Sequence, residues 1–338
     1  MNNTVILSCI LCAFNAEKTV LRTLGSLITS SKINYEIIII DDGSTDSTKR
    51  LIEIYKNFAN IKIISQENSG LGAARNKGLK AAVGEYVIFC DSDDVFFIDN
   101  LLNLASEAES GGYDIACSES YALVDSTEIS DFWDTHIIKM MSKSSPEVFS
   151  FAKYLLQPSV CNKLFNRKFI IAADIKFGEG VLFEDVQFTT HALLSTRKIM
   201  LSKKPVFLYD FHGNGSITSN KSLKRFDIFK NMYAVMPIVC GCKLNKLEFS
   251  AICISFMRIS LWCLDNIPVT HVEIFKKYIM EFFTLIKSEV EAQHLDIINK
   301  ILSDRWDRRA NFMLGAIWHS GLSDQEISGK FEEANLII

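Results

Sequence analysis

The chain has 338 residues, of which 48% are hydrophobic, 22% are charged and only 5 are proline. This is the composition of a folded globular protein, and its length suits one large domain with an appendage, or two domains. Its formal net charge is -4, whereas a protein that binds duplex nucleic acid without sequence preference normally carries an excess of basic residues. The sequence therefore does not predict nucleic-acid binding.

The chain contains 9 cysteines, an odd number, and several of them, such as Cys90, lie in apolar runs. We interpret them as reduced core residues of a cytoplasmic protein, because a small buried hydrophobe suits such positions. The pairs Cys9-x-x-Cys12 and Cys240-x-Cys242 each lack the second pair that a zinc site needs.

The apolar N-terminus, MNNTVILSCILCAF, has no basic leader and no small-residue cleavage site, so we do not expect a signal peptide. The longest apolar run elsewhere, Ser250 to Leu264, contains Arg258 and is shorter than the roughly 20 residues of a membrane span. From Arg197 to Lys230 there are eight Lys or Arg and two Asp, a local positive charge suited to phosphates, anionic lipid or solvent. We therefore expect a cytoplasmic protein, with peripheral contact at the inner face of the cell membrane left open.

Short β-branched runs alternate with helical patterns in the first third of the chain. The expected strands are Val5–Leu11, Glu36–Ile40, Ile61–Ser65 and Tyr86–Cys90. The expected helices are Glu17–Ile28, Thr45–Phe58, Gly72–Ala82 and Ile98–Ser110. This alternation predicts an α/β fold with a mostly parallel sheet covered on both faces, whose ligands sit beyond the carboxyl ends of the strands. The loops predicted to lie at this ligand edge are therefore Cys12–Ala16, Asp41–Asp46 and Asp91–Val95.

The pattern changes twice further along the chain. Residues from Tyr113 to Asn220 mix strands with short helices, and the chain becomes largely helical from Lys221. Helices are expected at Phe226–Val239, Lys246–Cys263 and Val272–Val290, where apolar residues recur at helical spacing. We therefore predict two regions, residues 1–220 and residues 221–338.

The motif Asp41-Asp42-Gly43-Ser44 ends a strand and opens a helix. Its carboxylates project at the ligand edge, where they can accept a hydrogen bond from a uracil N–H or a ribose hydroxyl, and Gly43 permits a tight turn. The alternative is that both aspartates satisfy the turn and the start of the following helix, a common use of Asp.

The motif Asp91-Ser92-Asp93-Asp94 follows the last of these strands. Three carboxylates at a strand end repel one another unless a cation neutralises them, and a hard divalent ion held with diphosphate oxygens is a usual solution. A solvated turn that caps the next helix is the alternative, and the motif by itself leaves both open.

Between these loops, Gly70-x-Gly72 resembles the start of a dinucleotide-binding fingerprint. The third glycine position is Arg75, however, and the pair follows a polar turn, so a dinucleotide-dependent dehydrogenase is disfavoured. Arg75 can direct its guanidinium at a pyrimidine carbonyl or a phosphate, and the alternative is a surface ion pair with a helix neighbour.

In this order and spacing, these motifs resemble the GT-A domain of glycosyltransferase family 2, with Asp91-Ser92-Asp93 in the position of its DXD motif. The resemblance covers residues 4 to about 105. It resumes at Asn162-Lys163-Leu164-Phe165, Phe183-Glu184-Asp185 and Gly215-Ser216-Ile217-Thr218. It implies a mostly parallel central sheet flanked by helices, with residues 1–220 as the catalytic domain and residues 221–338 as a helical extension for acceptor, membrane or oligomer contacts.

The resemblance also implies a set of site residues. Those expected to bind the donor are Ala13, Phe14, Glu17, Asp41, Arg75, Asp91 and Ser92. Asp93 is expected to be the principal ligand of a divalent Mn²⁺ or Mg²⁺, with Asp91 beside it. His212 is a further metal candidate, although an isolated histidine is more often an ordinary surface residue. The metal would neutralise the departing nucleotide diphosphate.

Asp185 matches the family's general base, and Glu184 is its competitor for that role. The base would take the proton of an acceptor hydroxyl as its oxygen attacks the anomeric carbon opposite the diphosphate, which inverts that centre. Asp185 can also be a helix cap, and we expect the helix N-terminus to lower its pKa. Lys163 and Arg167 are either acceptor contacts or solvated helix charges.

We therefore predict an inverting, metal-dependent glycosyltransferase of the hexosyltransferase type. It would move a sugar from a nucleotide diphosphate-sugar, expected to be UDP-linked, to a hydroxyl of a glycan or lipid-linked glycan in cell-surface polysaccharide biosynthesis. A sugar-phosphate nucleotidyltransferase would carry a Gly-rich, basic loop where this chain has Cys12–Glu17. A non-catalytic sugar-nucleotide-binding subunit would have lost a carboxylate of the metal or base position, and all are present. The oligomeric state is left open.

Overall fold

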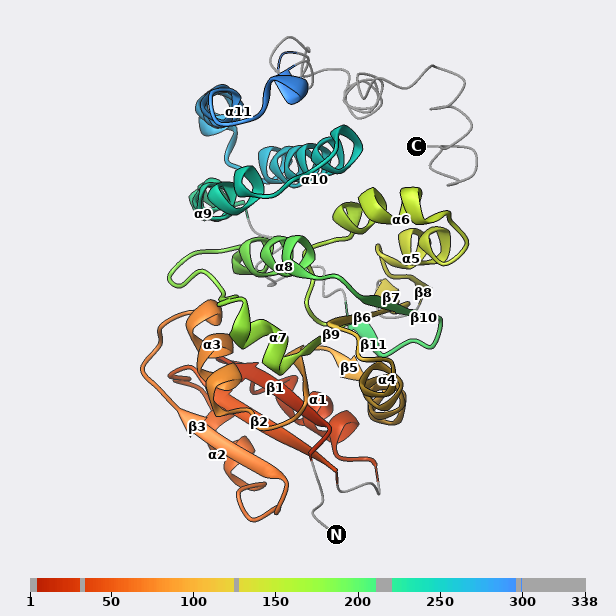
Figure 1. Cartoon of the computed structure of the whole chain (residues 1–338). Helices are drawn as coiled ribbons and strands as arrows, with labels where there is room; N and C mark the ends of the chain where they lie inside the picture. The colour runs from red at the N-terminus through yellow and green to blue at the C-terminus, as the bar shows by residue number, and fades with distance from the viewer. Residues whose placement is uncertain (1–4, 31–33, 125–127, 211–220, 296–298, 300–338) are drawn as a thin grey trace. The chain divides into compact units, whose positions relative to one another are not determined.

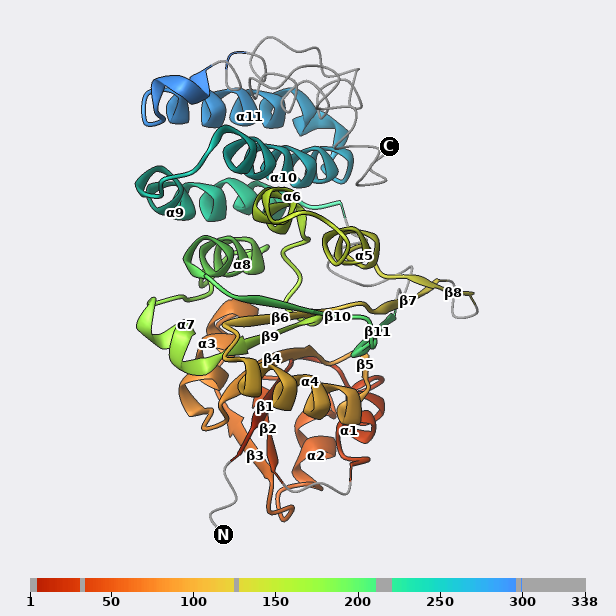
Figure 2. The same ribbon diagram turned by 45° about the vertical axis from the view of Figure 1, so that its right-hand side comes forward.

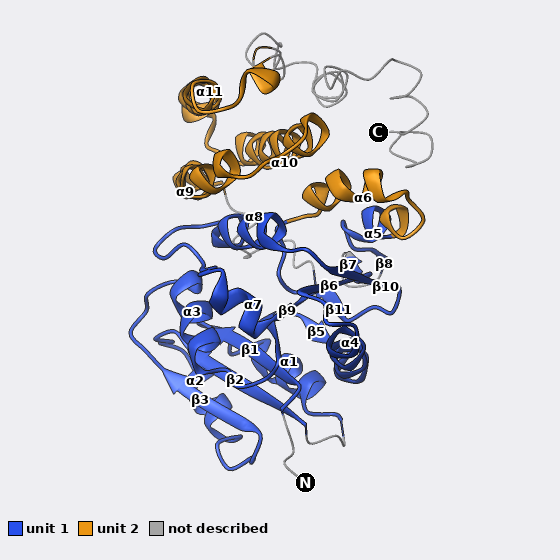
Figure 3. Cartoon of the chain, in the orientation of Figure 1, with its two compact units in different colours: residues 1–138, 158–214 blue, residues 139–157, 215–338 orange. Residues whose placement is uncertain are grey.

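The computed structural model describes residues 5–30, 34–124, 128–210, 221–295 and 299 (Figure 1). The chain forms two compact units (Figure 3). The first comprises residues 1–138 and 158–214, and the second comprises residues 139–157 and 215–338. Residues 139–157 thus join the helical unit although they precede the boundary that the sequence predicts at residue 220.

A seven-stranded sheet with the order β10-β6-β9-β4-β1-β2-β3 organises the first unit. Its parallel part consists of β1 (Leu7–Ala13), β2 (Tyr35–Asp41), β3 (Ile61–Ser65) and β4 (Tyr86–Asp91). The helices that follow these strands are α1 (Val20–Leu27), α2 (Thr48–Glu53), α3 (Leu71–Ala81) and, after the short strand β5 (Val95–Phe96), α4 (Ile98–Gly111). The expected strand and helix alternation is therefore confirmed, with ends that differ by a few residues.

Beyond β4 the sheet becomes mixed. The strand β9 (Lys163–Asn166) runs antiparallel to both β4 and β6 (Ile115–Ser118), and β10 (Ile199–Ser202) runs parallel to β6. A second, four-stranded sheet has the order β5-β11-β7-β8, with β7 (Tyr121–Val124), β8 (Glu128–Asp131) and β11 (Phe207–Asp210). The other helices of this part are α5 (Thr135–Met141), whose end belongs to the second unit, α7 (Arg167–Ala172) and α8 (Glu184–Ser195).

Both faces of β1, β2 and β4 are buried, which explains their continuous apolar runs, whereas the edge strand β3 is partly exposed. The helices α1, α2 and α4 pack on the face that carries Cys9 and Leu11, and α3 lies on the other face, where Gly78 meets Ile10 (Figure 2). All nine cysteines are free thiols. The interpretation of them as core residues is wrong for Cys240, which is exposed at the end of a helix.

The described part of the second unit is helical. Its elements are α6 (Pro146–Ala152), η1 (Lys153–Leu155), η2 (Leu223–Phe226), α9 (Asp227–Gly241), α10 (Lys246–Asp265), η3 (Val269–His271), α11 (Val272–Lys287) and η4 (Ala292–His294). A capping box starts α10, because the Glu248 N–H donates to Asn245 Oδ1 and the Asn245 N–H donates to Glu248 Oε2, each at 3.0 Å. By length and composition alone α10 is apolar enough to cross a bilayer, but 67% of that stretch is buried, as in the core helix of a globular unit.

Candidate functional site

The acidic loops meet at the carboxyl edge of the parallel strands. Ala13 of β1 pairs with Asp41 of β2, and Cys12 pairs with Asp91 of β4, so the three strands end side by side. Because side chains alternate along a strand, Asp41 and Asp91 leave this edge on opposite faces of the sheet. The first face carries α1 and α2, and the second carries α3.

Asp41 is buried, and its Oδ1 accepts a hydrogen bond from the Ser44 N–H at 3.1 Å. Gly43 between them has φ +73°, and a Cβ there would lie 2.7 Å from the backbone nitrogen of Asn68. The turn therefore requires glycine. The short loop brings the β2 end against the segment that precedes α3.

Asp42 is a structural brace for that segment. Its Oδ1 accepts from Gln66 Nε2 at 2.7 Å and from the Ser69 N–H at 2.9 Å, and its Oδ2 accepts from the Gly70 N–H at 2.9 Å. Because its carboxylate accepts three hydrogen bonds from this segment, Asp42 stabilises the fold of the loop.

The loop after β1 shows which of its predicted donor contacts are open. Phe14 is 49% exposed, so its ring is available to a ligand. The Glu17 carboxylate accepts a hydrogen bond from the Ser47 N–H at 3.0 Å, and Asn15 Oδ1 accepts one from the Thr45 N–H at 2.8 Å. Glu17 thus helps to fix the start of α2.

Arg75 is the hub of the site. Its guanidinium is buried, and it donates to Asp91 Oδ1 at 2.7 Å and to Glu184 Oε1 at 2.6 Å. It also lies over the Phe177 ring, 5.3 Å from its centroid. The alternative of a surface ion pair is therefore wrong, because Arg75 joins α3, the end of β4 and the start of α8 inside the protein.

A close backbone contact places Arg75 between its partners. A Cβ on Gly72, in the first turn of α3, would lie 2.0 Å from the carbonyl oxygen of Gly178 and 3.3 Å from Glu184 Cβ. Only glycine lets α3 approach this segment so closely. Phe183, with φ +63°, then turns the chain so that α8 begins at Glu184.

The Asp91-Ser92-Asp93-Asp94 motif is divided between solvent and core. Asp91 keeps 35% of its side chain exposed, whereas Asp94 is buried. Burial raises the pKa of the Asp94 carboxyl well above its ordinary value, and the charges of Asp91 and Asp93 raise it further. Arg22 of α1 donates to the Asp93 carbonyl and pairs with the Asp210 carboxylate.

This motif suits a hard divalent cation. Within the described residues, Asp91, Asp94 and Cys161 form a group of potential metal ligands whose ligand atoms lie within 4.8 Å of one another. Asp94 Oδ2 is buried and has no hydrogen-bond partner in the described part of the chain. Carboxylate oxygens are what Mg²⁺ and Mn²⁺ prefer, so Asp91 and Asp94 fit such an ion. Asp93, the predicted principal ligand, is not in this group, and its role stays a prediction.

Asp185 lies beside the Arg75 pair, in the first turn of α8. Burial and the adjacent Glu184 carboxylate raise its pKa to about 7, although Arg75 and Lys163 act in the opposite direction. The expectation that the helix N-terminus lowers this pKa is therefore wrong, because burial and the neighbouring charge outweigh it. Burial also raises the pKa of Glu184, which Arg75 partly offsets.

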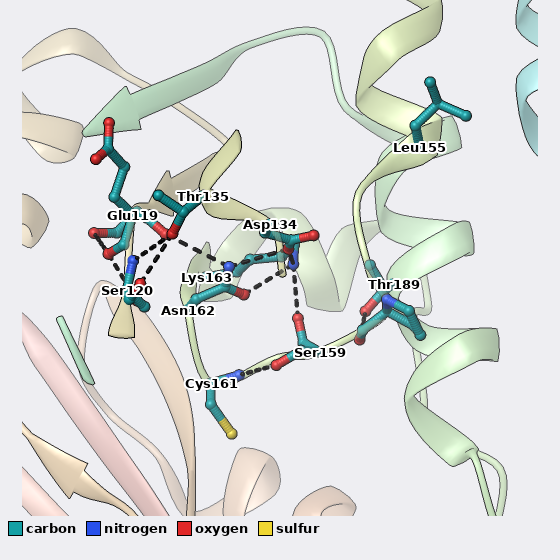
Figure 4. Close-up of polar contacts among 12 residues, drawn as sticks. Glu119, Ser120, Asp134, Thr135, Leu155, Ser159, Cys161, Asn162, Lys163 and Thr189 are labelled. Carbon is teal, nitrogen blue, oxygen red and sulfur yellow. Dashed lines mark hydrogen bonds and ion pairs between the residues drawn. The ribbon is translucent and has the colours of Figure 1, made fainter. Parts of the chain in front are cut away.

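Lys163 is fully buried in β9 (Figure 4). Its Nζ donates to Asp134 Oδ2 and to the Ser159 carbonyl at 2.8 Å, and to Asn162 Oδ1 at 2.9 Å. The interpretation of Lys163 as a solvated helix charge is wrong. A lysine in a four-residue strand gives no sequence signal of burial, because its partner lies 29 residues away.

Within the described part of the chain, the remaining predicted residues are not part of the Arg75 or Lys163 hydrogen-bond networks. Ser92 is half-buried, and His212 lies outside the described residues. Arg167 of α7 donates through Nε to the Gly84 carbonyl at 2.8 Å. Sequence reasoning did not single out Arg22 or Cys161, since neither belongs to a motif and only the folded chain brings them to the acidic loop.

Comparison with known proteins points to one family. The model for glycosyl transferase family 2 matches residues 8–170. The cholesterol galactosyltransferase of Borreliella burgdorferi is 31% identical over 226 residues, which are 64% of this chain and 63% of that protein. The putative glycosyltransferase EpsH of Bacillus subtilis is 32% identical over 222 residues, 62% of each chain. This chain thus spans less than two thirds of the length of these two relatives.

The fold has a solved counterpart. Residues 1–349 of Staphylococcus aureus TarS, crystallised with UDP-GlcNAc, match with a TM-score of 0.70 at 22% identity, over 92% of this chain and 90% of that one. This likeness shows a GT-A type α/β fold with a mostly parallel central sheet flanked by helices. The sequence match over residues 8–170, just under half of the chain, and the relatives above support a glycosyltransferase of family 2.

Proposed function

We propose that this chain is an inverting glycosyltransferase that moves a sugar from a UDP-sugar to a hydroxyl of a glycan or lipid-linked glycan, in the synthesis of a cell-surface polysaccharide. One observation carries the proposal. Arg75 holds Asp91 and Glu184 together at the carboxyl edge of the sheet, and Asp185, with a pKa of about 7, lies beside them. Perturbed carboxylates gathered at such an edge are typical of a catalytic site.

The donor side of the proposal rests on the loops of β1 and β2. The exposed Phe14 ring offers a face for a nucleobase, and Asp41 lies at the adjacent strand end. The structural counterpart TarS has been crystallised with UDP-GlcNAc and with UDP, which supports a uridine-linked donor. Ala13, Glu17, Arg75 and Ser92 complete the proposed donor contacts.

The acceptor side depends on Asp185. A carboxylate with a pKa of about 7 is a stronger base than an ordinary aspartate and is still ionised in part of the molecules at neutral pH. It would take the acceptor proton as the oxygen attacks the anomeric carbon from the side opposite the diphosphate. Glu184 is committed to Arg75 at 2.6 Å, which favours Asp185 as the base.

A divalent Mn²⁺ or Mg²⁺ would be held by oxygens of Asp91, Asp94 and Asp93. When bound, it supplies positive charge that stabilises the departing diphosphate. Two arginines position this acidic loop: Arg75 donates to the Asp91 carboxylate, and Arg22 donates to the Asp93 carbonyl.

We place the enzyme in the cytoplasm, at the inner face of the cell membrane where a lipid-linked acceptor would lie. The support is the local positive charge between Arg197 and Lys230, which suits anionic headgroups.

The test is release of nucleotide diphosphate from a panel of UDP-, GDP- and dTDP-sugars, with Mn²⁺ or Mg²⁺, for the parent, for Asp185→Asn and for the control Asp174→Asn. Asp174 is 79% exposed and has φ +52°, a conformation that Asn also accepts. We expect UDP release in the parent and in the control. In Asp185→Asn we expect kcat to fall about 100-fold or more, the usual share of general-base catalysis.

Two results would contradict the proposal. A loss below about tenfold in Asp185→Asn, roughly 1.4 kcal/mol of barrier, would remove Asp185 from the role of base. Binding of a nucleotide-sugar without any turnover in the parent would favour a non-catalytic sugar-nucleotide-binding subunit.

A further inference from the structure

A thiol faces the acidic loop of the site. Cys161 Sγ lies 3.5 Å from Asp91 Oδ2, and the ligand atoms of Asp91, Asp94 and Cys161 are all within 4.8 Å of one another. Cys161 and Asp94 are buried, whereas Asp91 keeps 35% of its side chain exposed. The group is therefore closed toward the core and accessible from the Asp91 side.

Each of the three side chains has a ligand atom to offer. Asp94 uses Oδ1 to accept from the Asp210 N–H at 3.1 Å, and its Oδ2 is buried without a hydrogen-bond partner in the described part of the chain. Asp91 uses Oδ1 for Arg75, which leaves Oδ2 facing the thiol. A buried carboxylate oxygen without a partner is costly, so it points to a missing positive charge.

The segment that carries the thiol is fixed by its neighbours. The Cys161 N–H donates to Ser159 Oγ at 3.4 Å, and the Ser159 carbonyl accepts from Lys163 Nζ at 2.8 Å. Asn162 Nδ2 donates to Asp134 Oδ2 at 3.0 Å. Figure 4 shows the sulfur turned away from this network. The ligand is thus held in place before any ion binds.

We propose that Asp91, Asp94 and Cys161 form a binding site for a thiophilic divalent cation such as Zn²⁺, with a fourth coordination position open toward solvent. Two oxygens and one sulfur suit Zn²⁺, whereas the sulfur gives Mg²⁺ nothing. On binding, the Cys161 S–H gives its proton to water and a Zn–S bond forms, so three negative ligands surround one doubly charged ion. The coordination stands independently of the proposed function.

The consequence for activity does rest on the proposed function. Because Asp91 and Asp94 belong to the proposed donor site, a bound Zn²⁺ would occupy the place of the hard cation and its diphosphate. Zn²⁺ would then be a competitive inhibitor that raises the apparent KM for the UDP-sugar.

The test uses Cd²⁺ and Zn²⁺ as probes of the full chain, with Cys240→Ser and Cys242→Ser as background because these two thiols are accessible. In this background we expect one Cd²⁺ per chain with the ultraviolet absorption of a sulfur–cadmium bond, and calorimetric binding of Zn²⁺. Cys161→Ala should abolish the absorption and weaken Zn²⁺ at least tenfold. Cys253→Ala, which removes an equally buried thiol from α10, should change neither.

Asp94→Asn is the second variant, in case Cys161→Ala folds poorly, and it should also weaken Zn²⁺ at least tenfold. The proposal is overturned if the background protein shows no absorption, or if the absorption survives Cys161→Ala. These readouts do not depend on turnover. If the protein shows the sulfur–cadmium absorption and binds Zn²⁺ but transfers no sugar, the proposed function alone is refuted. If it transfers sugar but does not bind Zn²⁺ through Cys161, this site alone is refuted.

Discussion

The Arg75 guanidinium is a single buried charge shared by two carboxylates. Glu184 is itself buried, so Arg75→Met leaves its charge without a partner in the protein interior. Removing one member of such a pair costs about 3–5 kcal/mol. We expect the free energy of unfolding, measured by urea titration, to fall by about 3 kcal/mol. Adding Glu184→Gln to Arg75→Met should recover part of this loss, and a single variant within 1 kcal/mol of the parent would contradict the prediction.

The pKa of Asp185 predicts the pH dependence of transfer. Below about pH 7 the carboxyl group is mostly protonated and cannot act as the proposed base. We expect kcat/KM to rise about tenfold per pH unit toward pH 7 and then to level off, measured with a saturating divalent ion. This rise of kcat/KM with pH should be absent from the residual activity of Asp185→Asn. An acidic limb centred near 4 in the parent would show that the base has an ordinary pKa.

The same shift predicts a stability effect of opposite sign to the activity effect. The native state binds the Asp185 proton more tightly than the unfolded chain, where the pKa is the ordinary 3.8. The stability that this group contributes is therefore lost as pH rises from about 4 to about 7. At pH 8, Asp185→Asn should be at least as stable as the parent in thermal unfolding. A clearly lower melting temperature would mean that lost activity reflects damaged structure.

At the residue scale, motif position predicts which carboxylates gather, but not their environment. Asp41 and Asp91 follow strands in the sequence, and the strand register brings them to one edge. The burial of Lys163, and the thiol next to Asp91, come from contacts between segments far apart in the chain. The pKa of Asp185 depends on such contacts too, which is why a rule about helix ends misjudged its direction.

At the element scale, the start of α3 is set by a close contact of backbones. Gly72→Ala would place a Cβ 2.0 Å from the Gly178 carbonyl, so the helix must move and take Arg75 with it. Gly25→Ala in α1 is the matched control, because nothing lies within 4 Å of the added Cβ. We expect Gly72→Ala to lose about 1–3 kcal/mol of unfolding free energy, and Gly25→Ala to gain about 0.5–1 kcal/mol from helix propensity. Equal gains in both variants would disprove the contact.

The sequence predicts elements well where periodicity is long. The strand Ile61–Ser65 has the expected ends, and α3 differs from its expected range by one residue at each end. The short strand β9 was missed, since its four residues include buried Lys163 and show no alternating pattern. It lies between β4 and β6 and runs antiparallel to both. The spacing of apolar residues along the chain does not show which strands will pair, so the mixed part of the sheet could not be predicted from it.

At the scale of the whole molecule, the family match and the compact units divide the chain differently. The match ends at residue 170, whereas residues 139–157 belong to the helical unit. There α6 and η1 contact α10, and Arg258 Nη2 donates to the Leu155 carbonyl at 2.9 Å. Residues 139–157 lie in the sequence between two parts of the first unit, but they belong to the second unit. Their composition does not reveal this. The predicted boundary at residue 220 therefore rests only on where the helical pattern begins.

This arrangement predicts how a fragment ending at residue 220 behaves. The fragment keeps α6 and η1 but loses α10, so Val148, Phe151 and Leu155, which are buried in the full chain, would be exposed. Each Å² of apolar surface returned to water costs about 25 cal/mol. We expect the fragment to bind the dye ANS strongly and to unfold with a broader transition than the full chain. The full chain with Ile274→Ser, a change at a residue that is 48% exposed on α11, should do neither. If the fragment were silent to ANS and unfolded as sharply as the full chain, residues 1–220 would be a self-sufficient domain, and residues 139–157 would not need α10.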